Sequence, residues 1–221
     1  MVSGLHKFDF DPADLDPNGI LENQTTGGAA TLVLDGALCD LGTPGQFDIG
    51  DAYGSGVGGV KLLFDSSGDI NTVVFTITGQ DQNGKDITET VTGVTTTPIT
   101  TVNYYSQVTQ IDTDSAVVLN VFIGTVTGEL VGRTIPINRY SYNECSLAVT
   151  DLVGTCVFNL QQTFDNVLDK NASVTWINIL AGQSADVVAL GTIGVSAVRL
   201  SMDSYTDGAE LQLHVSYQPF G

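Results

Sequence analysis

The chain alternates apolar and polar residues with a period of two in many short runs. The clearest run covers residues 210–217, where Leu211, Leu213 and Val215 alternate with polar residues. Successive side chains of a strand point to opposite faces, so this period predicts half-buried β-strands. Gly, Asp and Asn separate the runs, and with 25 glycines no long helix is expected. The pattern predicts an all-β protein, a sandwich or a barrel.

Two pairs of neighbouring runs are expected to form hairpins. In the first, the run of Val73, Phe75 and Ile77 leads through Asn83-Gly84 into a second run. In the other, residues 198–202 lead through a Thr-Asp-Gly turn into residues 210–217. Asn-Gly and Asp-Gly favour the positive φ angles of tight turns.

The remaining runs are predicted to be strands, except for one short helix. The helix is expected within residues 161–169. The strands are expected at residues 30–34, 60–64, 102–108, 117–123, 130–135, 145–149, 156–160, 174–179 and 186–190.

The distribution of these runs predicts two β domains, with an immunoglobulin-like or jelly-roll-like sandwich as the expected fold. The likeness of the two hairpins is consistent with a faint two-domain repeat. Residues 1–28 are polar and aperiodic and are expected to form an N-terminal arm. The first domain is expected at residues 29–128 and the second at residues 144–221. Residues 129–143, which contain Pro136 and a polar run, are the expected linker.

Charge and composition exclude several classes of partner. The 221 residues include seven Lys and Arg and twenty-five Asp and Glu, which gives a net charge of −18. Such a field repels phosphate backbones and anionic lipids, so we expect neither nucleic-acid nor membrane binding. No segment resembles a signal peptide or a membrane span. We therefore expect a chain that stays in a reducing cytosol, with Cys39, Cys145 and Cys156 as free thiols.

Two short motifs suggest ligands but are incomplete. Asp14, Asp16 and Asn18 followed by Gly19 match the first half of a calcium loop, whereas Thr25 stands where a closing Glu is required. A solvated turn is the favoured interpretation. Residues 54–59 match the dinucleotide motif G-x-G-x-x-G, but a strand rather than a helix is expected to follow. A flexible glycine loop is the favoured interpretation, and no cofactor or metal is expected.

Catalytic groups are scarce. Only His6 and His214 are available as bases, and a pairing of His214 with Ser216 lacks the surroundings of a nucleophile. Pairs of acids such as Asp112 with Asp114, or Asp203 with Asp207, are expected by chance among twenty-five acids. We therefore predict that the chain is not an enzyme, and we assign no catalytic residue.

The threonines of the first hairpin leave two interpretations open. They suit either a solvated sheet or a rigid surface for contact with another protein. These threonines are Thr72, Thr76, Thr78, Thr88, Thr90 and Thr92, followed by Thr95, Thr96, Thr97, Thr100 and Thr101.

The same hairpin resembles a β-sandwich module of tailed-bacteriophage structural proteins. The resemblance rests on Phe-Thr-Ile-Thr-Gly at residues 75–79, the Asp-x-Asn-Gly turn at 81–84 and Thr-Glu-Thr-Val-Thr-Gly at 88–93. It continues with Val-Asn-Tyr-Tyr-Ser-Gln-Val at 102–108 and ends in Val-Thr-Gln-Ile at 108–111. It covers about fifty residues, and the second half of the chain carries only a vaguer likeness.

The resemblance implies a virion component without enzymatic activity. The leading expectation is a head decoration or cement protein, assembled in the host cytoplasm, that forms a trimer and stabilises the shell of the major capsid protein. A neck or tail component is the alternative. A carbohydrate-binding adhesin would need a stripe of exposed aromatic residues, for which Trp176, Tyr104, Tyr105 and Tyr140 are the candidates.

Overall fold

The computed structural model confirms the all-β prediction. It describes residues 4–10, 16–39, 43–53, 56–93, 95, 97–137, 142–191, 194–206 and 208–219. Within these residues it contains seventeen strands, the five-residue helix α1 (Ile49–Tyr53) and a 3-10 turn at Ala37–Cys39. No helix in these ranges has the length and apolarity of a membrane span.

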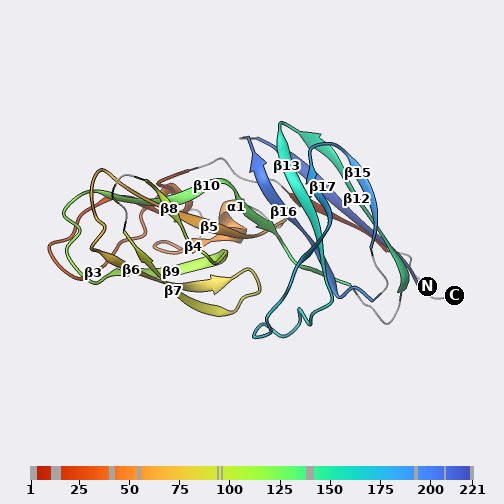
Figure 1. Ribbon diagram of the computed structural model, residues 1–221, viewed down its shortest axis with the longest axis horizontal. Coiled ribbons are helices and arrows are strands. Elements are labelled where there is room, and N and C mark those ends of the chain that lie inside the picture. Colours follow the sequence, from red (N-terminus) through yellow and green to blue (C-terminus); the bar gives the residue numbers. More distant parts are fainter. Residues whose placement is uncertain are drawn as a thin grey trace. The chain divides into compact units, whose positions relative to one another are not determined.

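The chain divides into two compact units (Figure 1). The unit that holds both chain ends, called here the terminal unit, comprises Met1–Asp14, Tyr53–Gly58 and Leu130–Gly221. The other, the central unit, comprises Leu15–Ala52 and Gly59–Glu129. Two long strands, β5 (Val57–Ser66) and β10 (Val121–Gly132), contribute residues to both units.

The terminal unit is a β-sandwich. One sheet has the strand order β1-β17-β12-β15, and the facing sheet contains β14-β13-β16 with the end of β10 and with β11. Phe10 and Leu213 of the first sheet and Leu200 of the second line a shared apolar cavity of about 10 Å³, so the two buried faces pack together. The strands are β1 (Gly4–Phe10), β11 (Ile135–Pro136), β12 (Tyr142–Val153), β13 (Cys156–Thr163), β14 (Ile177–Gln183), β15 (Val187–Gly191), β16 (Ala197–Tyr205) and β17 (Glu210–Pro219).

The central unit is an antiparallel sheet in the order β10-β5-β9-β6-β7, with four short strands added at its sides. Its buried face carries Phe47, Phe75, Ile77 and Ile111, all fully buried. These strands are β2 (Leu21–Gln24), β3 (Ala30–Thr31), β4 (Phe47–Asp48), β6 (Val74–Asp81), β7 (Asp86–Thr92), β8 (Ile99–Thr100) and β9 (Tyr105–Thr113).

The first expected hairpin is present as β6 and β7, which pair from Val74 with Thr92 to Gln80 with Asp86. Its loop is held by Asp81, whose carboxylate accepts hydrogen bonds from the backbone N–H groups of Asn83 and Lys85 at 2.8 and 3.0 Å. Gly84 adopts a φ of 73°, which explains the glycine.

The second expected hairpin is wrong. β16 pairs with β13, β10 and β11, whereas β17 pairs with β1 and β12 in the opposite sheet. The connection therefore crosses the sandwich. A period of two shows which face of a strand is buried but not which strand lies beside it, and two strands in facing sheets have the same period.

The helix expected at residues 161–169 is also wrong. β13 continues through Thr163, and Gln161 lies opposite Arg199 of β16. Beyond the strand, Asn166 and Asp169 accept hydrogen bonds from backbone N–H groups two residues ahead. Such local side-chain bonds compete with helix formation.

Several expected boundaries also differ. The expected N-terminal arm holds β1, which pairs along its whole length with β17, and β2, which pairs with β10. Phe10, Ile20 and Leu21 in this segment are buried. β10 runs without a break into the expected linker, which also holds β11. The strand expected at residues 30–34 is only two residues long.

The three cysteines are free and buried, and burial raises the pKa of the Cys145 thiol to about 11. Since the thiolate is the reactive form, we expect native protein at pH 8 to react with a thiol reagent more than about a hundredfold more slowly than unfolded protein. Denaturation without reductant should then expose three titratable thiols. Fewer than three would reveal a disulfide and contradict the reducing compartment.

Candidate protein-contact face

The outward face of the central sheet is an ordered polar surface, called here the contact face. It consists of three rows that cross the strands, and their members are half-buried to exposed. The rows are Asp86, Gln80, Gln107 and Asp48; then Thr88, Thr78 and Gln110; then Thr90, Thr76, Asp112 and Thr31.

Hydrogen bonds fix many of these side chains. The amide nitrogens of Gln80 and Gln107 donate to Asp86 and Asp48 at 3.0 and 3.5 Å, so the first row is bonded at both ends. In the third row, Asp112 accepts from the hydroxyl of Thr31 at 2.5 Å and from the amide of Gln110 at 2.7 Å. The groups that a partner meets are therefore already ordered, which lowers the entropy cost of binding.

The reverse side of the same strands gives this face a fixed base. Ile77 and Ile111, which are opposite each other on β6 and β9, are fully buried. A close-packed apolar layer restricts movement of the strands above it. The contact face can therefore offer a preformed surface to a protein.

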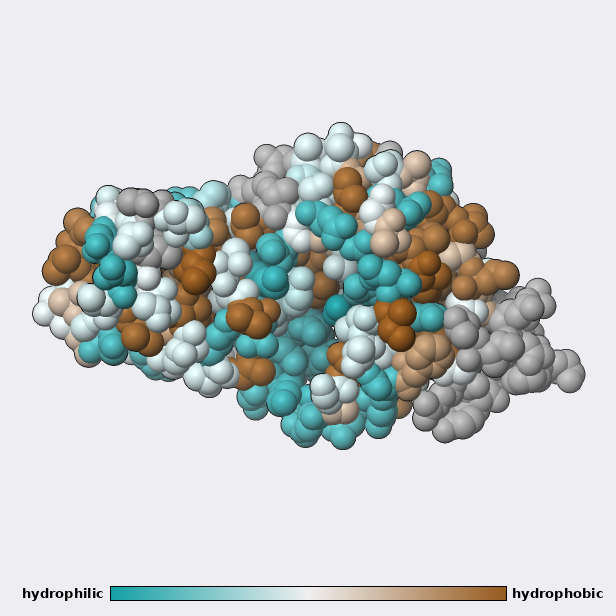
Figure 2. Space-filling view, viewed as in Figure 1, coloured by the Kyte–Doolittle hydropathy of each residue, from teal (hydrophilic) through white to brown (hydrophobic). Residues whose placement is uncertain are grey.

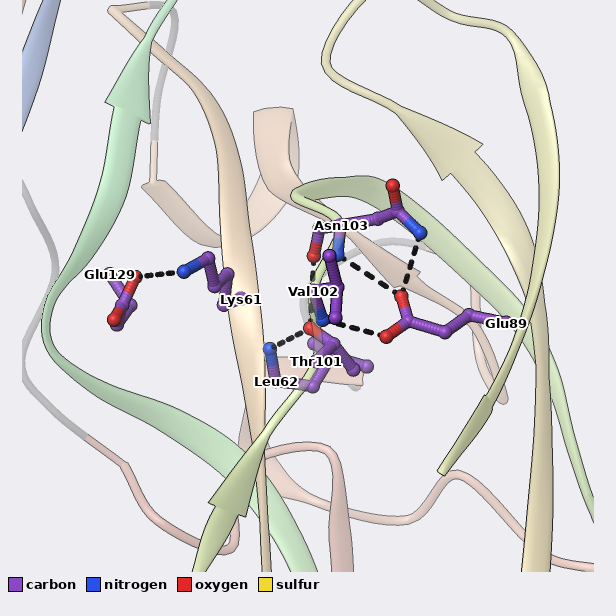
Figure 3. A network of polar contacts seen from close by, with 7 residues as sticks. All are labelled: Lys61, Leu62, Glu89, Thr101, Val102, Asn103 and Glu129. Carbon is purple, nitrogen blue, oxygen red and sulfur yellow. Dashed lines mark hydrogen bonds and ion pairs between the residues drawn. The ribbon is translucent and has the colours of Figure 1, made fainter. Parts of the chain in front are cut away.

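Glu89 of β7 points to the buried side and anchors the segment before β9 (Figure 3). One oxygen of its carboxylate accepts from the N–H of Val102 at 2.6 Å. The other accepts from the N–H and the side-chain amide of Asn103 at 3.1 and 2.9 Å, and from the Tyr105 hydroxyl at 3.4 Å. Burial, followed by the charge of Glu89, raises the pKa of Tyr105. Glu89 thus ties the last strand of the sheet to residues 102–105.

A second polar contact lies beside it. Lys61 of β5 turns toward Glu129 of β10 at 2.7 Å (Figure 3). Its ammonium also lies 5.1 Å from the centre of the Tyr104 ring. Burial by itself lowers the pKa of Lys61, but the bond to Glu129 and nearby negative charges leave that pKa raised. Thr101 accepts from the N–H of Leu62 at 3.0 Å and donates to Asn103 at 2.9 Å. These contacts hold strands together, and none places a nucleophile beside a base.

Glu89→Gln should lower the free energy of unfolding by about 1.5–3 kcal/mol, the range for a hydrogen-bonded charged group. The new amide keeps one oxygen, so its NH2 group would point donors at the N–H of either Val102 or Asn103. Chemical denaturation followed by circular dichroism measures the change. Glu22→Gln, an exposed position, is the matched control and should stay within about 0.5 kcal/mol of the parent protein.

The described part of the calcium-like motif, from Asp16 to Gly19, forms a turn. Asp16 accepts from the N–H of Asn18 at 3.2 Å, and its backbone exchanges hydrogen bonds with Thr125 of β10. Asp14 lies outside the described residues. Among the described residues, no three acidic, histidine or cysteine side chains gather in a way that could hold a metal.

The glycine-rich stretch continues into strand β5, as expected, and not into a helix. Its described part is tightly packed at Gly56 and Gly58, which differs from the expectation of a flexible loop. A Cβ at Gly56 would lie 1.6 Å from the carbonyl oxygen of Asp9, and one at Gly58 would lie 2.7 Å from that of Gly132. These glycines allow close approach of backbones.

The residues considered for catalysis have other partners. The ring of His214 contacts the Thr150 hydroxyl at 2.9 Å, while the register places Ser216 opposite Ser146. Asp203 accepts from the buried amide of Asn159 at 2.7 Å, and Asp114 accepts from the N–H of Val74 at 2.9 Å. That backbone bond lowers the pKa of Asp114. Asp207 and the side chain of His6 lie outside the described residues.

The described aromatic candidates have other roles within their own units. Tyr105 is buried in the central unit, whereas Trp176 belongs to the terminal unit and stacks on Arg199, 4.2 Å from the ring centre. Tyr104 faces Lys61. Tyr140 lies outside the described residues. Within the central unit, Tyr104 and Tyr105 therefore do not form an exposed aromatic pair on which a sugar ring could stack.

A cleft of about 450 Å³ lies beside the start of β17 in the terminal unit, with Lys7, Asp9 and Glu210 in its lining. Lys7 and Asp9 form an exposed ion pair at 3.7 Å. None of the lining residues is serine, cysteine or histidine. The described lining therefore has no Ser-His or Cys-His pair.

The threonines of the first hairpin mostly lie where the period of two placed them. Thr76, Thr78, Thr88 and Thr90 belong to the contact face, and the exposed Thr92 lies on the same side of β7. Thr72 precedes β6, and Thr101 is buried. The sequence pattern did not single out Glu89 or the three glutamines of the contact face, Gln80, Gln107 and Gln110. The alternation along β6 places Gln80 on the same side as Thr76 and Thr78, so Gln80 could have been predicted from the sequence.

No protein-family model matches the chain, and no curated protein matches it. The resemblance to phage modules therefore stays a prediction.

Proposed function

We propose that the chain is a non-enzymatic structural protein of a tailed-phage virion. Its place is the head, where it decorates and cements the shell by binding the major capsid protein. The virion proteins of such phages assemble in the host cytoplasm, which fits a chain with three free thiols. A trimer is the expected assembled form.

The observation that carries the proposal is the contact face. It is built on the strands whose residues resemble the phage module, β6, β7 and β9. Its side chains are held by one another and by the sheet, and they can exchange hydrogen bonds with a partner at little ordering cost. Polar contacts of this kind give specificity and a defined register on a partner.

A neck or tail component is the second candidate, because the same face would serve there. The adhesin alternative is disfavoured because Tyr105 is buried and Tyr104 faces Lys61. Direct binding of nucleic acid is disfavoured by the net charge of −18.

The test is to mix purified protein with capsids that lack it, with isolated tails and necks, and with a glycan array. We expect saturable binding to capsids and a higher temperature of capsid disruption, because a ligand of the intact shell stabilises it by mass action. Binding to tails or necks alone would transfer the proposal to the second candidate. Binding to glycans alone would refute the virion proposal.

A further inference from the structure

The sequence Asp-x-Asn-Gly occurs twice in the central unit, at residues 16–19 and 81–84. Both copies form the same turn. The aspartate carboxylate accepts a hydrogen bond from the asparagine N–H, at 3.2 Å for Asn18 and 2.8 Å for Asn83. The aspartate carbonyl accepts one from the glycine N–H, at 3.1 Å for Gly19 and 2.9 Å for Gly84. These are the two positions in the chain where asparagine precedes glycine.

Asparagine before glycine can lose its side-chain amide without an enzyme. The glycine nitrogen attacks the side-chain carbonyl carbon of the asparagine, and a C–N bond forms between them. The amide NH2 group and the proton of the attacking N–H leave together as ammonia, so a five-membered cyclic imide remains. Water then opens the imide at either carbonyl, which gives aspartate or isoaspartate. Glycine favours the reaction because it has no Cβ to obstruct the approach.

Packing blocks this reaction at the first copy of the turn. Gly19 is buried, and a Cβ there would lie 2.7 Å from the side chain of Leu38. The carbonyl of Gly19 also accepts from the N–H of Leu38 at 2.8 Å, and the next residue, Ile20, is fully buried. The nitrogen of Gly19 can therefore reach the side chain of Asn18 only if this packed segment unfolds.

The second copy lies in an open hairpin loop. Nothing lies within 4 Å of a Cβ at Gly84. Asp81 holds this loop, because its carboxylate also accepts from the N–H of Lys85 at 3.0 Å and its own N–H donates to the Lys85 carbonyl at 2.9 Å. When these bonds open, the nitrogen of Gly84 is free to attack Asn83 while β6 and β7 stay paired. Loop tips open at a lower cost in free energy than packed segments.

We propose that Asn83 is a site of spontaneous deamidation, that opening of the loop held by Asp81 limits its rate, and that packing protects Asn18. Each modified chain carries one more carboxylate, close in sequence to Asp81 and Asp86. Asn83 is only half-buried, and the visible face of the central unit mixes hydrophilic with hydrophobic residues (Figure 2), so water can hydrate the new charge. Isoaspartate also lengthens the backbone of the loop by one atom. The modification goes beyond capsid binding and does not depend on it.

The test incubates the full-length parent protein at pH 8 and measures deamidation of each asparagine by peptide mapping with mass spectrometry. In native protein we expect Asn83 to react at least about tenfold faster than Asn18, because its loop opens more readily. In denaturant the two rates should become similar, since only the chemistry of Asn-Gly remains. Native rates that are equal, or faster at Asn18, would overturn the proposal. So would an Asn83 that stays intact while denatured protein reacts fully.

Asp81→Ala tests whether the loop limits the rate. Loss of its bonds should accelerate the reaction at Asn83 at least about tenfold, because a hydrogen bond to a charged group is worth about that factor or more. The matched control is Asp69→Ala, which removes the same kind of bond, from the N–H of Asn71 at 3.0 Å, and should leave the rate at Asn83 unchanged. A constant rate at Asn18 shows that both variants stay folded. Equal acceleration by both substitutions, or none by Asp81→Ala, would contradict the role of Asp81.

Discussion

Phe75→Ala should lower the free energy of unfolding by about 3–5 kcal/mol, the range for truncating a buried phenylalanine. Phe75 of β6 is fully buried, and its ring centre lies 5.4 Å from that of Phe64 on β5. The substitution removes this contact and leaves a cavity directly beneath the contact face. The neighbouring strands can close it only in part, since both are fixed by their hydrogen-bonded partners.

Denaturant unfolding measured by circular dichroism gives this value. Phe164→Ala is the matched control, because Phe164 is 42% exposed, and it should cost less than about 1 kcal/mol. Equal losses in the two variants would show that Phe75 is not part of a tight core.

Gly79→Ala should destabilise the protein by about 3 kcal/mol, the upper end of the usual range for overpacking, although it adds a single methyl group. A Cβ at this position would lie 2.0 Å from the carbonyl oxygen of Gln107, and that atom is backbone of β9. One strand must move away from the other, which breaks their ladder beside the irregularity at Thr78 and Gly79. Gly79 is also the last residue of the Thr-Ile-Thr-Gly run that contributes to the resemblance to phage modules.

The same denaturation experiment tests this expectation. Gly27→Ala is its matched control, because nothing lies within 4 Å of the added carbon, and it should change stability by less than about 1 kcal/mol. If Gly79→Ala is as stable as the control, the close approach of β6 and β9 is not real.

Local sequence patterns predicted which residues form strands, but they did not predict which strands lie beside one another. The alternation in residues 210–217 placed Leu211, Leu213 and Val215 on a buried side, and all three are buried. Nothing in that alternation shows that β17 lies between β1 and β12. Pairing depends on which surfaces meet across the whole chain, and a residue run does not contain that information.

The contact face was predictable only in part for the same reason. The position of Thr76 and Thr88 on the face could be predicted, because the period of two applies within a hairpin whose Asn-Gly turn can be recognised in the sequence. Asp48 and Thr31 join the face because β4 and β3 dock on β9 across sequence separations of 59 and 81 residues. The N-terminal strand was missed because Lys7 and Asp9 make its exposed side look like that of a free arm. Its apolar residue Phe10 was the available signal.

The central claim, that the contact face binds the capsid shell, is tested most directly by titrating bare capsids with T88K/T90K. Thr88 and Thr90 are exposed on the outer side of β7, so the lysines should obstruct the face without disturbing the core. T43K/T175K carries the same change of charge at exposed threonines elsewhere and serves as the control. We predict that T88K/T90K binds at least about tenfold more weakly than the parent, while the control binds like the parent. Equal binding by all three proteins would contradict the account.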